Sequence, residues 1–184
     1  MADLIGGIPF GVDDLKVSAR TAGGALAATK QDIFGATEIS AAVDSKVEEA
    51  RGDNLGVRKS RSGKKVAGTV KMLQHDPAIL AIVGEGATSA AGVSPNTITS
   101  YLEPEAPGQK TYQIEAQSFD GLSATRLTIF NASTIKGPNF NWKTDGYSEP
   151  SFDYEGSGLL NGGIVALYKV EVFATGVVLG TTNP

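Results

Sequence analysis

Few residues of this 184-residue chain could take part in covalent or metal chemistry. It has no cysteine and a single histidine, His75, which excludes disulfides, thiolate zinc sites, iron–sulfur clusters and sites with two histidine ligands. A serine triad would need a carboxylate to orient His75. The neighbouring Asp76 precedes Pro77 and an apolar run, so we expect it to cap a helix instead. The sequence therefore predicts no catalytic residue, no metal site and no cofactor.

Two glycine-containing segments resemble nucleotide-binding loops only superficially. In residues 56–65 the spacing to Gly63-Lys64 is too long for a phosphate-binding loop, and Lys65 stands where Ser or Thr should contact magnesium. Residues 84–89 begin like a dinucleotide fingerprint, but Ser89 replaces the third glycine and the segment follows an expected helix end. Neither segment supports nucleotide binding, and the sequence contains no Gly-x-Ser-x-Gly nucleophile elbow.

The strongest charge feature lies in residues 51–71, which hold seven basic side chains and one acid, Asp53. The rest of the chain has nine basic and nineteen acidic groups, and the net charge is −4. The segment is either a solvated basic loop or an arm that docks on the acidic surface of an identical neighbour, because opposite potentials favour docking. Its candidate contact residues are Arg51, Arg58, Lys59, Arg61, Lys64 and Lys65. Specific nucleic-acid binding is not expected, since the loop has no aromatic side chain for base stacking.

A pair of acids, Asp153 and Glu155, alternates with Phe152 and Tyr154 on an expected strand. Residues two apart share a face of a strand, so both carboxylates lie opposite the aromatic rings. They form either an ordinary solvated face or an acidic wall that lines a channel.

Strand-like alternation dominates the elements that position these residues, and we expect a mainly β fold in one domain, residues 1–184. Residues 111–117 alternate so that Tyr112, Ile114 and Ala116 are buried and the polar side chains between them are wet. Residues 164–172 place apolar side chains on one face. Further strands are expected at residues 15–19, 98–102, 124–130, 140–144 and 152–155. Short strands at this spacing indicate a β-sandwich or barrel, and no segment approaches the 18 apolar residues that membrane insertion would require.

Residues 38–48 fit either helical or strand periodicity. We favour a strand, because residues 65–73 alternate in the same way and the two would form a long hairpin, with a mobile tip at residues 51–64. One short helix is expected from Pro77 to about Gly84, capped by Asp76. Residues 1–14 are a possible amino-terminal arm, and residues 176–184 a carboxyl-terminal tail.

The order of these features resembles that of phage tail tube, or major tail, proteins, over roughly residues 35–175. After the long hairpin come VAGTVKML (66–73) and the capped helix DPAILAIVG (76–84), then the hairpin TYQIEA (111–116) and TRLTIFN (125–131), and finally DGYSEPSFDY (145–154). The resemblance rests on the order of elements more than on any diagnostic motif.

The resemblance implies a β-sandwich or barrel with a flanking helix that assembles into hexameric rings, which stack into a tube for DNA passage. It implies a virion location after assembly in the host cytoplasm, with tape-measure, tail-terminator and baseplate proteins as further partners. The basic tip would then be the inter-ring contact, and Asp153 and Glu155 candidates for an acidic lumen. Two alternatives stay open: the inner tube of a contractile injection apparatus, and a carbohydrate-binding β-sandwich that uses Phe140 and Trp142.

Overall fold

The computed structural model describes residues 12, 14–21, 24–51, 57–84, 86–93, 97–105, 108, 110–119, 123–140, 144–146, 148–161, 163–173 and 179–180. The fold is mainly β, with a curled sheet and one short helix, as the alternation predicted. Its elements are β1 (Asp14–Ala19), β2 (Gln31–Asp32), β3 (Ala36–Ile39), β4 (Ala42–Arg51), β5 (Val57–Met72), α1 (Pro77–Val83), β6 (Ala87–Ala91), β7 (Ile98–Leu102), β8 (Tyr112–Phe119), β9 (Ala124–Asn139), β10 (Ser151–Gly156), β11 (Leu159–Asn161), β12 (Ile164–Ala166) and β13 (Tyr168–Phe173).

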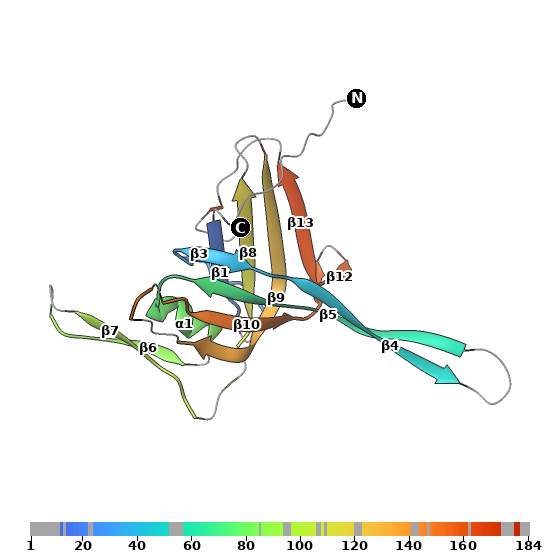
Figure 1. Cartoon of the computed structure of the whole chain (residues 1–184), viewed down its shortest axis with the longest axis horizontal. Coiled ribbons are helices and arrows are strands. Elements are labelled where there is room, and N and C mark those ends of the chain that lie inside the picture. The colour runs from blue at the N-terminus through green and yellow to red at the C-terminus, as the bar shows by residue number, and fades with distance from the viewer. Residues whose placement is uncertain are drawn as a thin grey trace.

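The main sheet turns a corner along its central strand, β9 (Figure 1). The first half of β9 pairs with β8 on one edge and with β13 on the other, and its second half pairs with β10. Ala132 lies at the change, opposite both Tyr112 of β8 and Gly156 of β10. Strands β2, β1 and β8 extend the sheet on one side, and β10, β5 and β3 extend it on the other. The two groups of strands therefore cross and enclose the core between them.

The core lies inside this corner and is closed at one end by α1. Its fully buried side chains include Val17, Val70, Ile114, Ile129 and Tyr154. Helix α1 begins as expected: the Asp76 carboxylate accepts a hydrogen bond from the Ala78 amide at 2.8 Å, and Pro77 occupies the first turn, where no amide donor is needed. The helix buries Ile79, Leu80 and Val83.

The expected strand at residues 38–48 is interrupted. Strands β3 and β4 both pair with β5, but Ser40 and Ala41 lie between them. At the interruption the Ser40 amide donates to the Thr69 carbonyl, and the Ser40 hydroxyl accepts from the Thr69 amide at 2.9 Å. The helical alternative for this segment is excluded.

Two other expected strands differ from the structure. Phe140 follows the end of β9 and lies in no strand, and Thr144 lies in a bend, so a strand over residues 140–144 was wrong in its described part. The segment 164–172 is two strands, β12 and β13, which separate at Leu167. Strand β12 pairs with β11 in a small hairpin, whereas β13 joins β9 in the main sheet.

Two hairpins project from opposite ends of the molecule's long axis (Figure 1). At one end, β4 and β5 continue beyond the sheet as a two-stranded ribbon, here called the arm (residues 42–65), whose ladder reaches Arg51 opposite Val57. At the other end, β6 and β7 form a separate two-stranded ribbon.

The chain ends lie largely outside the described residues. Of the expected amino-terminal arm, residues 1–14, the structure describes Val12 and Asp14, and Asp14 already belongs to β1. Of the expected tail, residues 176–184, it describes Leu179, which is buried, and Gly180.

Candidate functional site

The arm carries the basic residues that the sequence singled out. Arg51 ends β4, while Arg58, Lys59 and Arg61 lie on β5; the side chains of these four residues are outside the described part of the chain. Lys64 and Lys65 lie nearer the sheet and are exposed. The predicted loop at residues 51–64 was too long, because residues 57–64 are paired strand and only 52–56, which are not described, separate the strands. Mobility of the tip stays a prediction.

The structure brings together one residue of the predicted basic contact, Lys65, and one residue of the predicted acidic face, Glu155. The Lys65 ammonium lies 2.9 Å from a Glu155 carboxylate oxygen, and both side chains remain partly exposed. Lys65 was assigned to the inter-ring contact and Glu155 to the lumen wall. Within one chain these residues form an ion pair at the root of the arm.

The face that carries Asp153 and Glu155 is mixed in charge. Both side chains lie opposite buried Phe152 and Tyr154, as the alternation predicted. Asp153 accepts a hydrogen bond from the Thr69 hydroxyl at 2.6 Å and lies opposite Lys136 in the neighbouring strand. Farther along β5 and β3, Lys71 pairs with Glu38 at 2.5 Å. Each described acid of this face has a basic or hydroxyl neighbour, which weakens its assignment as an acidic wall.

The polar face of β8 is buried, contrary to the expectation of a wet face. Gln113, Glu115 and Gln117 are all less than one-tenth exposed. The Lys30 ammonium donates to both oxygens of Glu115 at 2.8 Å, and the two side chains are only 8% and 7% exposed. Strand β8 lies between β1 and β9, and Arg20 and Lys30 supply the cations that contact its polar side chains.

Arg20 continues this buried network. Its guanidinium donates to the Gln113 side-chain oxygen at 3.0 Å and to the Phe130 carbonyl at 2.7 Å, and Gln113 in turn donates to Glu115 at 2.8 Å. Burial lowers the pKa of Arg20 from its ordinary value. Sequence reasoning missed the network because the pairs lie 85 and 93 residues apart and leave no local pattern.

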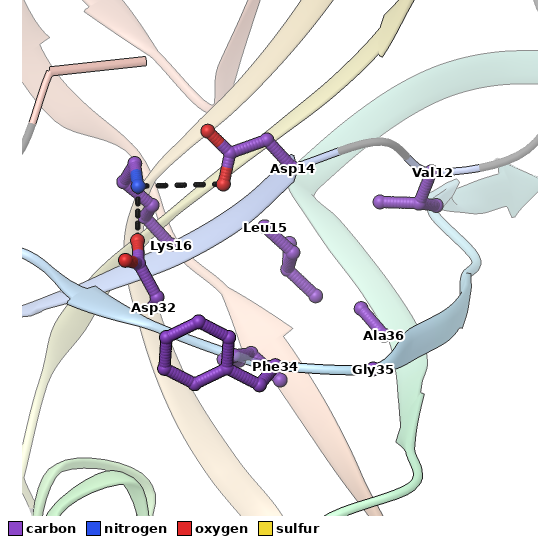
Figure 2. A pocket seen from close by; sticks show the side chains of 9 residues that line it. Val12, Asp14, Leu15, Lys16, Asp32, Phe34, Gly35 and Ala36 are labelled. Atoms are coloured by element: carbon purple, nitrogen blue, oxygen red, sulfur yellow. Dashed lines mark hydrogen bonds and ion pairs between the residues drawn. The ribbon is translucent and has the colours of Figure 1, made fainter. Parts of the chain in front are cut away.

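A hollow of about 370 Å³ lies beside Lys16, as Figure 2 shows. The Lys16 ammonium is held between Asp32, with which it also forms a hydrogen bond, and Asp14 at 3.4 Å. Burial, the largest single influence, lowers the pKa of Lys16, but the hydrogen bonds and charges of the two carboxylates together raise it. The hollow is lined by Val12, Asp14, Leu15, Lys16, Asp32, Ile33, Phe34, Gly35 and Ala36. The amine is already neutralised by its neighbours, so a structural role explains this cluster.

His75 lies near a hydroxyl but is not oriented by its neighbouring acid. Its Nε2 lies 3.2 Å from Ser148 Oγ, and its ring stacks on Phe140 with the centroids 5.3 Å apart. Asp76 is directed to the amides of α1 instead, as expected for an N-cap. Trp142, the second aromatic of the carbohydrate-binding alternative, lies outside the described residues.

A cluster of large apolar side chains is exposed on β12 and β13. Their exposed fractions run from 42% for Tyr168 to 71% for Ile164. This edge cluster comprises Ile164, Val165, Tyr168, Val170 and Val172. Among the described strands, β13 pairs only with β9, so its other edge is open. The sequence predicted apolar side chains on one side of this segment, but it did not predict that they would be exposed to solvent.

Within the described residues, no helix is long and apolar enough to cross a membrane, and no group of three or more His, Asp or Glu side chains could hold a metal ion. No protein-family model matches the sequence, and no curated protein is significantly similar to it.

Proposed function

We propose that this protein is a structural subunit that assembles with copies of itself into stacked rings that form a tube, as in the phage tail tube proteins that its sequence resembles. The observation that carries the proposal is the edge cluster on β12 and β13. Patches of large exposed apolar side chains mark interaction sites, and an open strand edge is a template for pairing with another chain. A neighbouring subunit would cover both.

The arm is a second feature that favours assembly. Its strands extend well beyond the sheet, and the described core lies outside residues 42–65. A two-stranded ribbon alone is marginally stable in water, so such an arm gains stability from a partner surface. Its basic residues and the acidic remainder of the chain are suited to contact between identical copies.

The proposed cargo of the tube is inferred from the resemblance alone. Passage of DNA without specific binding is the leading proposal, and protein delivery by a contractile injection apparatus is the variant. The mixed charge around Asp153 and Glu155 gives no independent support for an acidic lumen.

Electron microscopy of the purified protein tests self-assembly, and rings or hollow tubes are the expected particles. Val170→Lys, which places a charge in the edge cluster, should leave monomers with an unchanged circular dichroism spectrum. Ile135→Lys is the matched control, because Ile135 is similarly exposed, at 60% against 54%, but lies on the second half of β9. Monomers of the unmodified protein under all assembly conditions would exclude the proposal.

A further inference from the structure

The β6–β7 ribbon has an unusual composition for an exposed element. Residues 87–102 contain no charged side chain, and each described residue of both strands is exposed except one. Exposed strand edges usually carry lysine or other charges that oppose pairing with another chain. This ribbon has no such protection.

The two faces of the ribbon differ. One face carries Ile98 and Leu102, which are 66% and 67% exposed, with Ala91 and Ala87 opposite them in the register. The other face carries Tyr101, whose hydroxyl accepts a hydrogen bond from the Gly86 amide at 3.2 Å. Tyr101 thus ties the root of the ribbon to the segment after α1. The aliphatic face is left without a covering among the described residues.

A hollow of about 520 Å³ lies at the root of the arm. The arm and β12 lie on the side of the molecule away from the β6–β7 ribbon (Figure 1). It is lined by Val43, Gly63, Lys64, Gly158, Val165, Leu167 and Tyr168. Three of these, Val43, Val165 and Tyr168, are large apolar side chains with substantial exposure. The hollow therefore offers an apolar floor of the kind that the aliphatic face of the ribbon needs.

Exposed charges of opposite sign lie beside the two surfaces, and each surface also has one neighbour of the other sign: Lys110 donates to the Gly86 carbonyl at the root of the ribbon at 2.6 Å, and Glu155 pairs with Lys65 beside the hollow. Glu103 and Glu105 follow β7 directly and are exposed. Lys64 lines the hollow, and Lys65 beside it is 58% exposed while it pairs with Glu155. Opposite charges at the rim of an apolar contact favour one orientation of docking over another.

We propose that the aliphatic face of the β6–β7 ribbon docks into the Val43–Val165–Tyr168 hollow of a second copy of this chain. The ribbon and the strands that line the hollow lie on opposite sides of the molecule (Figure 1), so the contact is head-to-tail and leaves one free ribbon and one free hollow on every pair. Further subunits can add through the same contact, until the assembly closes into a ring or continues as a filament. The inference rests on the proposed self-assembly for its partner, and adds which surfaces meet.

Disulfide cross-linking tests the contact directly, because the natural chain has no cysteine. Leu102→Cys and Val165→Cys are made as separate proteins, mixed before assembly and oxidised mildly. We expect a cross-linked dimer that contains one copy of each variant. Thr99→Cys lies on the opposite face of β7 and is the matched control. When Thr99→Cys replaces Leu102→Cys in the mixture, we expect no cross-linked dimer, since a disulfide requires the two Cα atoms to lie within about 7 Å of each other.

Lysine substitution gives a second readout. Leu102→Lys should abolish assembly, and Thr99→Lys should leave it intact, with both chains folded by circular dichroism. A disulfide that joins only two copies of Leu102→Cys would overturn the head-to-tail contact. Tubes that form from the two cysteine variants without a disulfide between them would overturn it too. In the latter case self-assembly would stand. Absence of any assembly by the unmodified protein would overturn both proposals.

Discussion

At the scale of single residues, the buried polar side chains of β8 are the most consequential. Gln113 and Glu115 point away from the apolar core, yet they are only 7% and 5% exposed. A buried polar group is costly unless it is hydrogen-bonded, and Lys30 and Arg20 satisfy these two. The network thereby fastens Arg20 and Lys30 to the polar face of β8.

Removing one partner of the Lys30–Glu115 pair should be strongly destabilising. Lys30→Met leaves a buried carboxylate uncompensated, and we expect it to lower the free energy of unfolding by about 3–5 kcal/mol. Lys30→Met/Glu115→Gln should recover most of that loss, because the amide is neutral and can still accept from Gln113. Urea unfolding measures both. Lys71→Met, at the exposed Lys71–Glu38 pair, is the control and should change stability little; equal losses at both pairs would contradict the prediction.

Stability should fall above pH 10. Burial raises the pKa of Tyr112 and of Tyr154 above the ordinary value of 10.0, and the pKa of Lys16 is raised above 10.5. Each group therefore holds its proton longer in the folded than in the unfolded chain. Their stabilising contributions are complete below the unfolded pKa values and are lost as the pH rises through the folded ones.

Urea unfolding from neutral pH to about pH 11 would measure this dependence. Tyr154→Phe should make the alkaline decline shallower than in the unmodified protein. A decline that is equally steep in Tyr154→Phe would show that other groups cause it.

At the scale of elements, the interruption between β3 and β4 depends on one glycine. A Cβ at Gly68 would lie 1.8 Å from the Ser40 carbonyl oxygen and 2.8 Å from the Tyr154 hydroxyl. That hydroxyl donates to the same carbonyl at 2.7 Å. Backbone and a buried ring thus occupy the space of a side chain, which explains why the strand partner of Tyr154 is glycine.

Gly68→Ala should therefore destabilise the fold by about 1–3 kcal/mol or more, because the backbone at Ser40 must shift. The midpoint of urea unfolding is the measurement. Gly137→Ala is the control, since a Cβ there meets nothing within 4 Å, and its effect should stay below about 0.5 kcal/mol. Similar small effects at both glycines would contradict the steric argument.

The arm should be dispensable for folding but required for assembly. Replacing residues 47–61 by Asn-Gly joins Lys46 to Ser62, which already lie opposite each other, through a tight turn. Since the described core has no member in residues 42–65, we expect a circular dichroism spectrum that is still of the β type and an unchanged melting temperature. Electron microscopy should show no stacked tubes. Tubes of normal length from the shortened protein would refute a role for the arm.

At the scale of the whole molecule, basic and acidic side chains are segregated along the chain. Seven of the sixteen basic residues lie in residues 51–71, while the rest of the chain is acidic. The two projecting ribbons combine this charge with apolar surface, one basic and the other uncharged. Assembly should therefore depend on both electrostatic and hydrophobic contacts.

Raising the salt concentration should weaken assembly. Between about 0.05 and 0.5 M NaCl the screening length falls to a few ångströms, so attraction between the basic arm and an acidic neighbour is largely lost. The pelleted fraction in sedimentation should decrease over this range, and Lys64→Glu should reduce it already at low salt. An assembly that is insensitive to salt would indicate association through apolar surfaces alone.

Much of the fold followed from local pattern. The capped helix α1, the hairpin of β8 and β9, and the alternation in β10 were predicted correctly, because each depends on residues close in sequence. The strand expected over residues 140–144 was wrong in its described part, and the loop at residues 51–64 was too long. In the second case polar side chains obscured a backbone ladder that continues to Arg51 and Val57.

The candidate surfaces were less predictable. Alternation in residues 164–172 identified an apolar face, but whether such a face is buried depends on which strand pairs beside it. Asp153 and Glu155 share a face as expected, yet the cations beside that face come from Lys65 and Lys136, on other strands.

The sequence by itself determined the mainly β class, the helix with its cap and the segregation of basic residues. Only the tertiary structure decided that the polar face of β8 is buried, that Lys65 pairs with Glu155, and that the edge cluster and the β6–β7 ribbon face solvent. The physical reason is the sequence separation over which each effect acts. Periodicity, capping and composition act between neighbours along the chain, whereas burial and ion pairing depend on which distant segments the sheet order places side by side.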